Sequence, residues 1–237
     1  MISTVGLLSP GDMGHSLGHV LRHDGMRVIT CLTGRSERSQ ALAAEAGIED
    51  VASDEELVGQ ADVFLSVLPP DQALGLAERI SAAVKETGAQ LLYVDCNAVS
   101  PNSVRRVAEV ITGAGARFVD AGIIGNPPRP DRPGPKIYAS GHDAAELAEL
   151  RSYGLDIRVM DGDVGQASGI KMCYAALTKG LTALGTELLV AAERMGLSAA
   201  LHAELESSQN GILPWLTRQI PSMPPKAYRW VGEMLEI

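Results

Sequence analysis

The chain begins with a short apolar run that breaks at a glycine-containing turn and continues as a helical pattern. Residues 4–8 read Thr-Val-Gly-Leu-Leu, and residues 9–14 read Ser-Pro-Gly-Asp-Met-Gly. From residue 16 to residue 21, apolar residues recur at helical spacing. A strand that turns at glycines directly into a helix is typical of the first unit of a nucleotide-binding α/β fold. This turn constrains the fold more than any other stretch of the chain.

The two glycines of the turn have separate physical roles. Gly11 allows the backbone to approach a pyrophosphate, and Gly14 allows the helix to pack closely on the strand. The first amides of the helix and the positive end of its dipole would face the phosphates. The first glycine of the usual G-x-G-x-x-G pattern is Ser9 here. Taken alone, these residues fit a nucleotide site and a purely structural turn equally well.

Composition excludes several classes of protein. With 237 residues, 46% of them hydrophobic, the chain can bury a sizeable core in one or two domains. A net charge of -9 argues against nucleic acid or an anionic membrane as the main partner. Cys31, Cys96 and Cys173 lie far apart, so we expect reduced thiols and no metal site. We find no signal sequence and no apolar run near the ~18 residues of a membrane span, and expect a cytoplasmic protein.

Strand-like and helical patterns alternate through the first two thirds of the chain. We expect strands at residues 4–8, 27–32, 61–68, 91–95, 117–121, 136–140 and 155–160. We expect helices at 36–46 and 71–87 and another that starts at Ser100-Pro101, with a proline-rich loop over 122–135. The alternation predicts an α/β fold with a doubly wound, mostly parallel Rossmann sheet.

After residue 162 the pattern becomes purely helical. We expect a long helix over 164–195 and further helices over 198–208 and 226–236, around proline-containing turns at Pro214 and 221–225. The predicted domains are a dinucleotide-binding domain over 1–162 and an all-α domain over 163–237. The apolar surface of such a helix has to be buried against other helices, and few helices remain in the chain. We therefore expect a homodimer through this part. The alternative is that the helix lies along its own sheet domain.

The turn after the second expected strand favours NADP over NAD. In NAD sites an Asp or Glu about 20 residues past the glycines binds the ribose 2′-hydroxyl. No acid stands there, and the chain has Thr33-Gly34-Arg35-Ser36 instead. A guanidinium and a hydroxyl suit a 2′-phosphate. The alternative is that Arg35 and Arg38 are two solvated arginines at a helix start.

Five short segments follow one another in the order of a known family's motifs. Residues 10–14 are similar to L-G-x-M-G, 67–69 to M-L-P, 95–101 to D-x-S-T-x-S-P, 120–126 to D-A-P-V-S-G-G, and 162–171 to G-x-x-G-x-G-x-x-x-K. The chain thus resembles the β-hydroxyacid dehydrogenase and 6-phosphogluconate dehydrogenase superfamily. It is most similar to the uncharacterised NAD(P)-binding oxidoreductases in that group that carry a short helical C-terminal domain.

The resemblance implies an NADP-dependent oxidoreductase that acts on a small hydroxyacid, aldehyde or related carbonyl or alcohol. The cofactor-binding residues implied by the turns and the resemblance are Ser9, Pro10, Gly11, Asp12, Met13, Gly14, Gly34, Arg35, Ser36, Leu68, Pro69 and Asn97. The substrate-binding residues that it implies are Asn97, Gly122, Ile124, Gly125, Asn126 and Tyr174. The family's catalytic lysine maps onto Lys171.

The sequence around Lys171 supports this role. Gly165, Ala167 and Gly169 precede it in the long helix, so another element can approach closely and exclude solvent. Burial lowers the pKa of a lysine from about 10.4, as a general acid/base at neutral pH requires. The alternative is a lysine that snorkels from a buried helix. Helical spacing places Tyr174 and Thr178 toward the same face.

Several positions depart from the family pattern. Ile124 replaces a serine of the substrate loop, Asn126 replaces its last glycine, Asn97-Ala98 replaces a Ser-Thr pair, and Tyr174-Ala175 replaces two asparagines. A plain β-hydroxyacid substrate is therefore in doubt.

Three basic residues of the proline-rich segment leave two interpretations open. Arg129, Arg132 and Lys136 could supply an anion site or form only a solubilising loop edge.

Two other functions are compatible with the sequence. The altered positions favour a non-catalytic NADP-binding sensor or partner-binding module. Imine reductase-like activity is the other, and the retained Lys171 argues against it because such relatives replace the lysine.

Overall fold

The computed structural model describes residues 1–129 and 134–237, except for the side chain of Arg229. Arg132, one of the three basic loop residues, lies outside the described part. The described chain forms two compact units, and each is considered by itself. The first contains Met1–Met172 with Glu236, and the second contains Cys173–Leu235 with Ile237.

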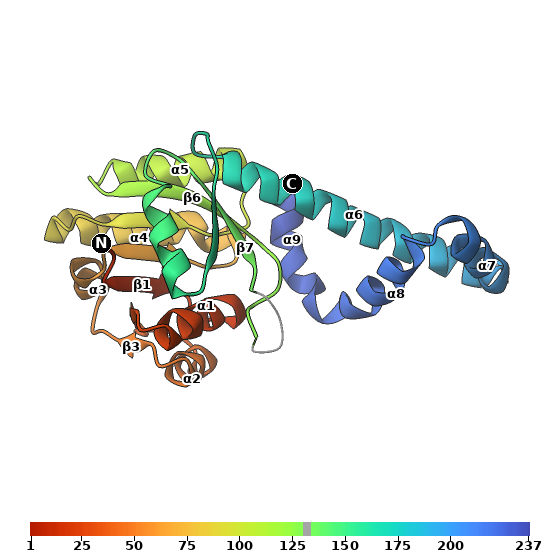
Figure 1. Ribbon diagram of the computed structural model, residues 1–237, viewed down its shortest axis with the longest axis horizontal. Helices are drawn as coiled ribbons and strands as arrows, with labels where there is room; N and C mark the ends of the chain where they lie inside the picture. The colour runs from red at the N-terminus through yellow and green to blue at the C-terminus, as the bar shows by residue number, and fades with distance from the viewer. Residues whose placement is uncertain (130–133) are drawn as a thin grey trace. The chain divides into compact units, whose positions relative to one another are not determined.

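The first unit is built on an eight-stranded sheet with the order β3-β2-β1-β4-β5-β6-β7-β8 (Figure 1). The strands are β1 (Thr4–Leu8), β2 (Arg27–Thr30), β3 (Glu49–Asp50), β4 (Val63–Ser66), β5 (Leu92–Asp95), β6 (Arg117–Ile124), β7 (Lys136–Ser140) and β8 (Asp156–Val159). All neighbouring strands are parallel except β6 and β7, which are antiparallel. The first six strands have the Rossmann order, so the expected doubly wound sheet is confirmed.

Helices cover both faces of this sheet. One face packs against α3 (Asp54–Gln60), α4 (Ala73–Thr87) and α5 (Pro101–Thr112), and the other against α1 (Asp12–His23), α2 (Glu37–Glu45) and the 3₁₀ helix η2 (Glu146–Tyr153). Side chains of the strands alternate between the two cores. On the α4 side, Tyr93 packs between Phe64 and Phe118 with ring centroids 5.1 and 5.8 Å away.

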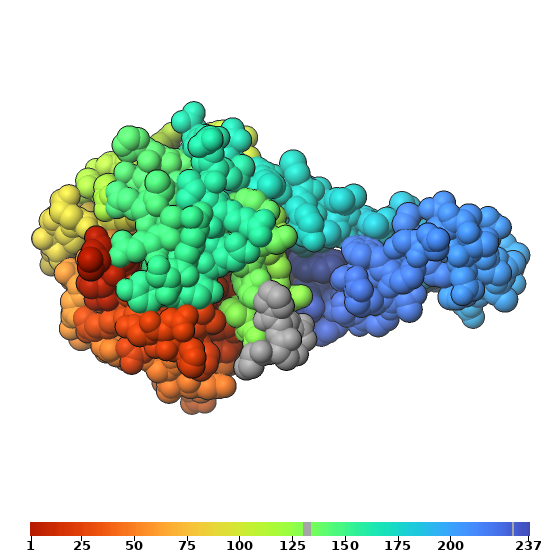
Figure 2. Space-filling view, viewed as in Figure 1, coloured from red at the N-terminus to blue at the C-terminus, as the bar shows by residue number. Residues whose placement is uncertain are grey.

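The amino terminus is held beside η2. The backbone amide of Ile2 donates to the carboxylate of Glu149 at 2.8 Å. Figure 2 shows the first residues, in red, next to the η2 segment, in green. The first strand is therefore fixed at its start as well as by its two neighbouring strands.

Short elements escaped the sequence analysis. β3 has two exposed acidic residues, and α3 has only seven residues, too few for a clear apolar period. A capping signal was present, because Ser53 accepts from the amide of Glu56. The expected loop over 122–135 is wrong at its start: β6 continues to Ile124, since β7 supplies hydrogen-bond partners from Ile124↔Lys136 to Asp120↔Ser140.

The second unit is helical. It contains α7 (Ser198–Ser208), α8 (Leu213–Ser222), the 3₁₀ helix η3 (Pro224–Lys226), α9 (Ala227–Glu236) and most of α6 (Gln166–Arg194). Gly185 of α6 packs against α8, since a Cβ there would lie 2.2 Å from Leu216 Cδ2. The expected turns at Pro214 and 221–225 are wrong in part. Pro214 stands in the first turn of α8, where its missing N–H costs nothing, and Pro221 stands near the end of that helix.

The two compact units divide inside α6, between Met172 and Cys173. Asp120 of β6 is fully buried and accepts from the amides of Gly165 (2.8 Å) and Ser168 (3.0 Å) and from the Ser168 hydroxyl (2.6 Å). Ser140 donates to the same carboxylate at 3.2 Å and accepts from the amide of Ala167 at 3.0 Å. These bonds satisfy amides that a helix start leaves without intrahelical partners. The first turns of α6 therefore belong to the sheet unit.

By length and composition, α6 alone among the described helices could cross a membrane. The expectation that no apolar run approaches this length is therefore wrong. A single such helix is weak evidence for a membrane protein, because a core helix passes the same test.

We expect Asp120→Ala to lower the free energy of unfolding by about 2–4 kcal/mol, because buried N–H groups and a hydroxyl lose their acceptor. Asp156→Ala is the matched control: it removes an exposed ion pair with Arg158 and should cost less than about 1 kcal/mol. Urea unfolding measures both. Equal losses would contradict the role of Asp120 as the anchor of α6.

Candidate cofactor and active site

The glycine turn connects β1 to α1 at the carboxyl edge of the parallel strands. Gly14 has no room for a side chain, because a Cβ there would lie 2.0 Å from the carbonyl oxygen of Ser9. Gly11 is the N-cap of α1, and no side chain of the described residues caps this helix. The first amides of α1 can therefore bind an anionic group, as the sequence analysis expected of a phosphate site.

Ser9 contacts Arg35. The Nη2 group of Arg35 donates to Ser9 Oγ, although the two residues come from different βα turns. Arg35 Nε is buried and has no hydrogen-bond partner among the described residues. Burial lowers the pKa of Arg35, and the positive charge of Arg79 lowers it further. An orphaned guanidinium N–H is unfavourable unless something accepts from it, so this side chain fits an anionic group of a cofactor.

The other groups of this turn are engaged within the protein. Arg38 forms an ion pair with Asp12, beside the glycine turn. Ser36 is the N-cap of α2, and its hydroxyl accepts from the amide of Ser39 at 3.3 Å. Arg35 is thus the arginine of this turn whose position best suits a bound phosphate.

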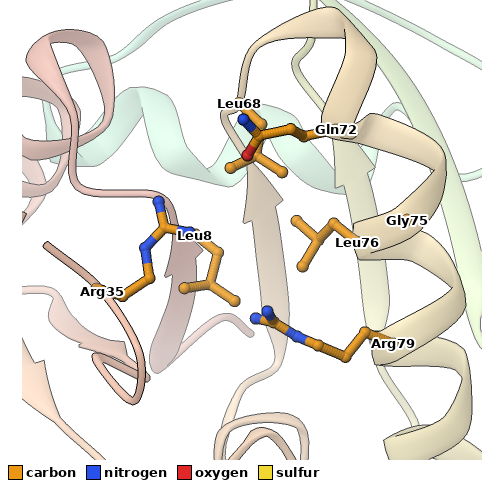
Figure 3. Close-up of a pocket in the computed structure, with 7 residues that line it drawn as sticks. All are labelled: Leu8, Arg35, Leu68, Gln72, Gly75, Leu76 and Arg79. Carbon is orange, nitrogen blue, oxygen red and sulfur yellow. The ribbon is translucent and has the colours of Figure 1, made fainter.

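A pocket of about 260 Å³ opens beside Arg35 (Figure 3). It is lined by Leu8, Arg35, Leu68, Gln72, Gly75, Leu76 and Arg79. Arg35 and Arg79 enter it from two different walls, the first from the turn after β2 and the second from α4. Arg35 and Leu68 were predicted from the sequence, whereas the residues of α4 were not, because only the fold brings α4 next to the β2 turn.

Asn97 joins the carboxyl ends of β4 and β5. Its Oδ1 accepts from the amide of Leu68 at 2.6 Å, and its Nδ2 donates to Ser66 Oγ at 2.8 Å and to Asp95 Oδ2 at 3.0 Å. The side chain is 2% exposed. Asn97 thus orients the turn at Leu68 and Pro69, a role that its position in the sequence did not show.

Asp95 is the buried acceptor that fixes Asn97. Its Oδ1 accepts from the Asn97 amide at 3.0 Å. The pKa of Asp95 is raised to about 7 overall. Burial is the largest cause, hydrogen bonds from Asn97 lower the pKa, and the nearby Asp120 raises it. Because the folded-state pKa lies above the ordinary value, Asp95 contributes stability at low pH that is lost as the pH rises toward 7.

Lys171 lies on the second turn of α6, next to β6, and is half-buried. Its Nζ donates to the carbonyl oxygen of Ile123. Gly122 makes this approach possible: a Cβ there would lie 2.4 Å from the carbonyl oxygen of Ala167 and 3.1 Å from Lys171 Cβ. Lys171, which corresponds to the catalytic lysine of the family it resembles, thus lies at the carboxyl end of β6, on the same edge of the sheet as the glycine turn.

The other expected substrate residues differ in their surroundings. Ile124 is half-buried at the end of β6, and Gly125 and Asn126 follow it as exposed residues. Gly125 has a φ of 135°, which favours glycine. Tyr174 is 50% exposed and belongs to the second unit.

Of the three basic loop residues, two are described. Arg129 is exposed, and Lys136 stands in β7 opposite Asp156 of β8. Lys136 is thus a strand residue with an acidic neighbour rather than part of the loop.

Comparison with protein families gives two matches. Residues 2–151 match the NAD binding domain of 6-phosphogluconate dehydrogenase, and residues 192–237 match a domain of unknown function, DUF1932. The first match covers most of the sheet unit, and the second covers the last part of α6 and all the helices that follow.

Individual relatives agree with this assignment. The chain is 31% identical to an uncharacterised 28.5 kDa protein of Methanothermus fervidus, over 86% of this chain and 77% of the relative. It is 25% identical to the mitochondrial 3-hydroxyisobutyrate dehydrogenase of Drosophila melanogaster, over 87% of this chain but only 64% of that enzyme.

A solved structure extends the likeness to the fold. A conserved protein of unknown function, described as similar to 3-hydroxyacid dehydrogenases, superimposes with a TM-score of 0.76 and 34% identity, over 98% of this chain and 87% of that one. With the Rossmann order, the glycine turn and the collinear motifs, the matches establish the ancestry of the chain. It belongs to the family of NAD(P)-binding oxidoreductases that share the NAD-binding domain of 6-phosphogluconate dehydrogenase.

Proposed function

We propose that the protein is an NADP-dependent oxidoreductase that transfers a hydride between nicotinamide and a small hydroxyacid, aldehyde or related substrate. The observation that carries the proposal is the position of Lys171, whose Nζ is held at Ile123 on the carboxyl edge of the sheet. In open α/β sheets ligands bind at this edge. Some residues on this edge then bind the cofactor, and Lys171 transfers the proton.

In the proposed reaction, NADP supplies the hydride chemistry when bound. The first amides of α1 would hold the pyrophosphate, and the Arg35 guanidinium would donate hydrogen bonds to the 2′-phosphate. Lys171 exchanges a proton with the substrate oxygen as general acid or base. Gly122 lets α6 approach β6, and Asp120 fixes the first turns of that helix, so both position Lys171.

The substrate class is proposed from the family. The Drosophila relative is a 3-hydroxyisobutyrate dehydrogenase, which fits a small hydroxyacid or its carbonyl counterpart. Ile124 and Tyr174 replace polar residues of the family pattern. We therefore propose a less polar substrate contact here than in a plain β-hydroxyacid site.

We also propose a homodimer through the helical unit. The exposed apolar side chains Tyr174, Leu177 and Leu184 recur on one side of α6 at helical spacing. A patch of this kind on a helix fits a second copy of the same surface. We place the protein in the cytoplasm, where its three cysteines would stay free.

Lys171→Ala should lower kcat by about 10²–10⁴-fold, because the proton donor is lost. Hydroxyacids, aldehydes and semialdehydes are screened with wild type and variant, and NADPH fluorescence serves as the control for cofactor binding. Turnover that survives the substitution undiminished would contradict the mechanism. Cofactor binding by wild type without turnover on any of these compounds would favour a non-catalytic NADP-binding module.

Arg35→Ala should remove most of the preference for NADPH over NADH, a loss of roughly 10-fold or more in relative affinity. The reason is that a charge-assisted bond to the 2′-phosphate disappears while contacts shared by both cofactors stay. Titration of both dinucleotides measures it, with Arg117→Ala, whose guanidinium pairs with Glu146, as the control. An unchanged preference would refute this role of Arg35.

The double substitution Leu177→Glu with Leu184→Glu should convert the dimer to a monomer, because it places charges on the proposed interface. Sedimentation velocity measures the state, and Glu187→Gln on the same helix is the control. A wild type that sediments as a monomer would contradict the dimer outright.

A further inference from the structure

The pocket beside Arg35 carries two positive charges, and no acidic side chain is among its lining residues. Its apolar part consists of Leu8, Leu68 and Leu76. The pKa of Arg35 is lowered by burial and by Arg79, so the two guanidinium groups are close enough to repel each other. An anion placed between them would relieve that repulsion.

Arg79 is held in place from one side. Its Nε lies 2.6 Å from Asp54 Oδ2, and its Nη2 donates to Asp54 Oδ1 at 3.3 Å. The two bonds occupy one edge of the planar guanidinium, and a guanidinium carries five N–H donors. The ion pair thus fixes the direction of Arg79 and leaves donors on another edge for a second acceptor.

Gly75 leaves space on the wall that α4 contributes. A Cβ at Gly75 would meet no atom within 4 Å, so the pocket is open at this point of α4. Arg79 follows Gly75 by one helical turn, and both line the pocket (Figure 3). A ligand that enters beside Arg35 therefore reaches the wall from which Arg79 projects.

We propose that Arg79 is a second residue for the adenosine 2′-phosphate, which it binds together with Arg35 while Asp54 holds it in position. This inference rests on the proposed use of NADP. The class of ligand follows from the site: an apolar surface for a flat ring next to two guanidinium groups for a phosphate dianion. Arg79 is then a specificity-determining residue supplied by α4 rather than by the turn after β2.

The test uses the full chain with 2′,5′-ADP and 5′-AMP as probes, next to NADPH and NADH. Arg79→Gln should weaken 2′,5′-ADP and NADPH roughly 10-fold or more and change 5′-AMP and NADH by less than about 2-fold. Lys85→Gln removes a charge from an exposed position of the same helix and should leave all four affinities unchanged.

A second variant separates binding from structure. Asp54→Asn removes the ion pair but keeps a side-chain oxygen that can accept from Arg79, so it should lose part of the selectivity for the 2′-phosphate but less than Arg79→Gln loses. Equal losses of selectivity in Asp54→Asn and Arg79→Gln, or equal losses of 5′-AMP and 2′,5′-ADP affinity in Arg79→Gln, would overturn the assignment. If wild type binds NADPH and NADH equally, the proposed NADP preference fails; if Arg35→Ala loses the preference and Arg79→Gln keeps it, only this inference fails.

Discussion

The candidate active site depends on the hydrogen bonds between the buried carboxylate of Asp120 and the first turn of α6. This carboxylate lies in β6 and accepts from the first amides of α6 and from the Ser168 hydroxyl. Asp120 and Gly165 are 45 residues apart in the chain. Charge-assisted hydrogen bonds thus join their strand and helix in a dry environment, where such bonds are strong. The position of Lys171, one turn further along α6, follows from this anchor and from the small size of Gly122.

The proposed cofactor site follows the same principle of groups fixed from several elements. Ser9 departs from the glycine of the usual motif, and its hydroxyl accepts from Arg35. The departure thus has a consequence in the fold, because it connects the turn after β1 with the turn after β2. Asn97 and Asp95 perform a similar task between β4 and β5, where they hold the turn at Leu68.

Sequence alone predicted the α/β class, seven of the eight strands and the long helix, because these elements have strong apolar periods. It missed α3 and β3, which are too short for a period, and it placed Gly122 in a loop because pairing with β7 is a long-range property. Arg35 was visible as a basic residue at a known turn. Arg79 and the Ile123 carbonyl that accepts from Lys171 were not, since only folding brings them to the site.

In the proposed mechanism, cofactor binding and proton transfer take place on one edge of the sheet. The most direct test is a crystal structure of the protein with NADP. We expect the pyrophosphate at the first turn of α1, the 2′-phosphate against Arg35 Nε, and the nicotinamide ring at the carboxyl end of β6 near Lys171. A dinucleotide bound away from this edge, or a nicotinamide remote from Lys171, would contradict the account.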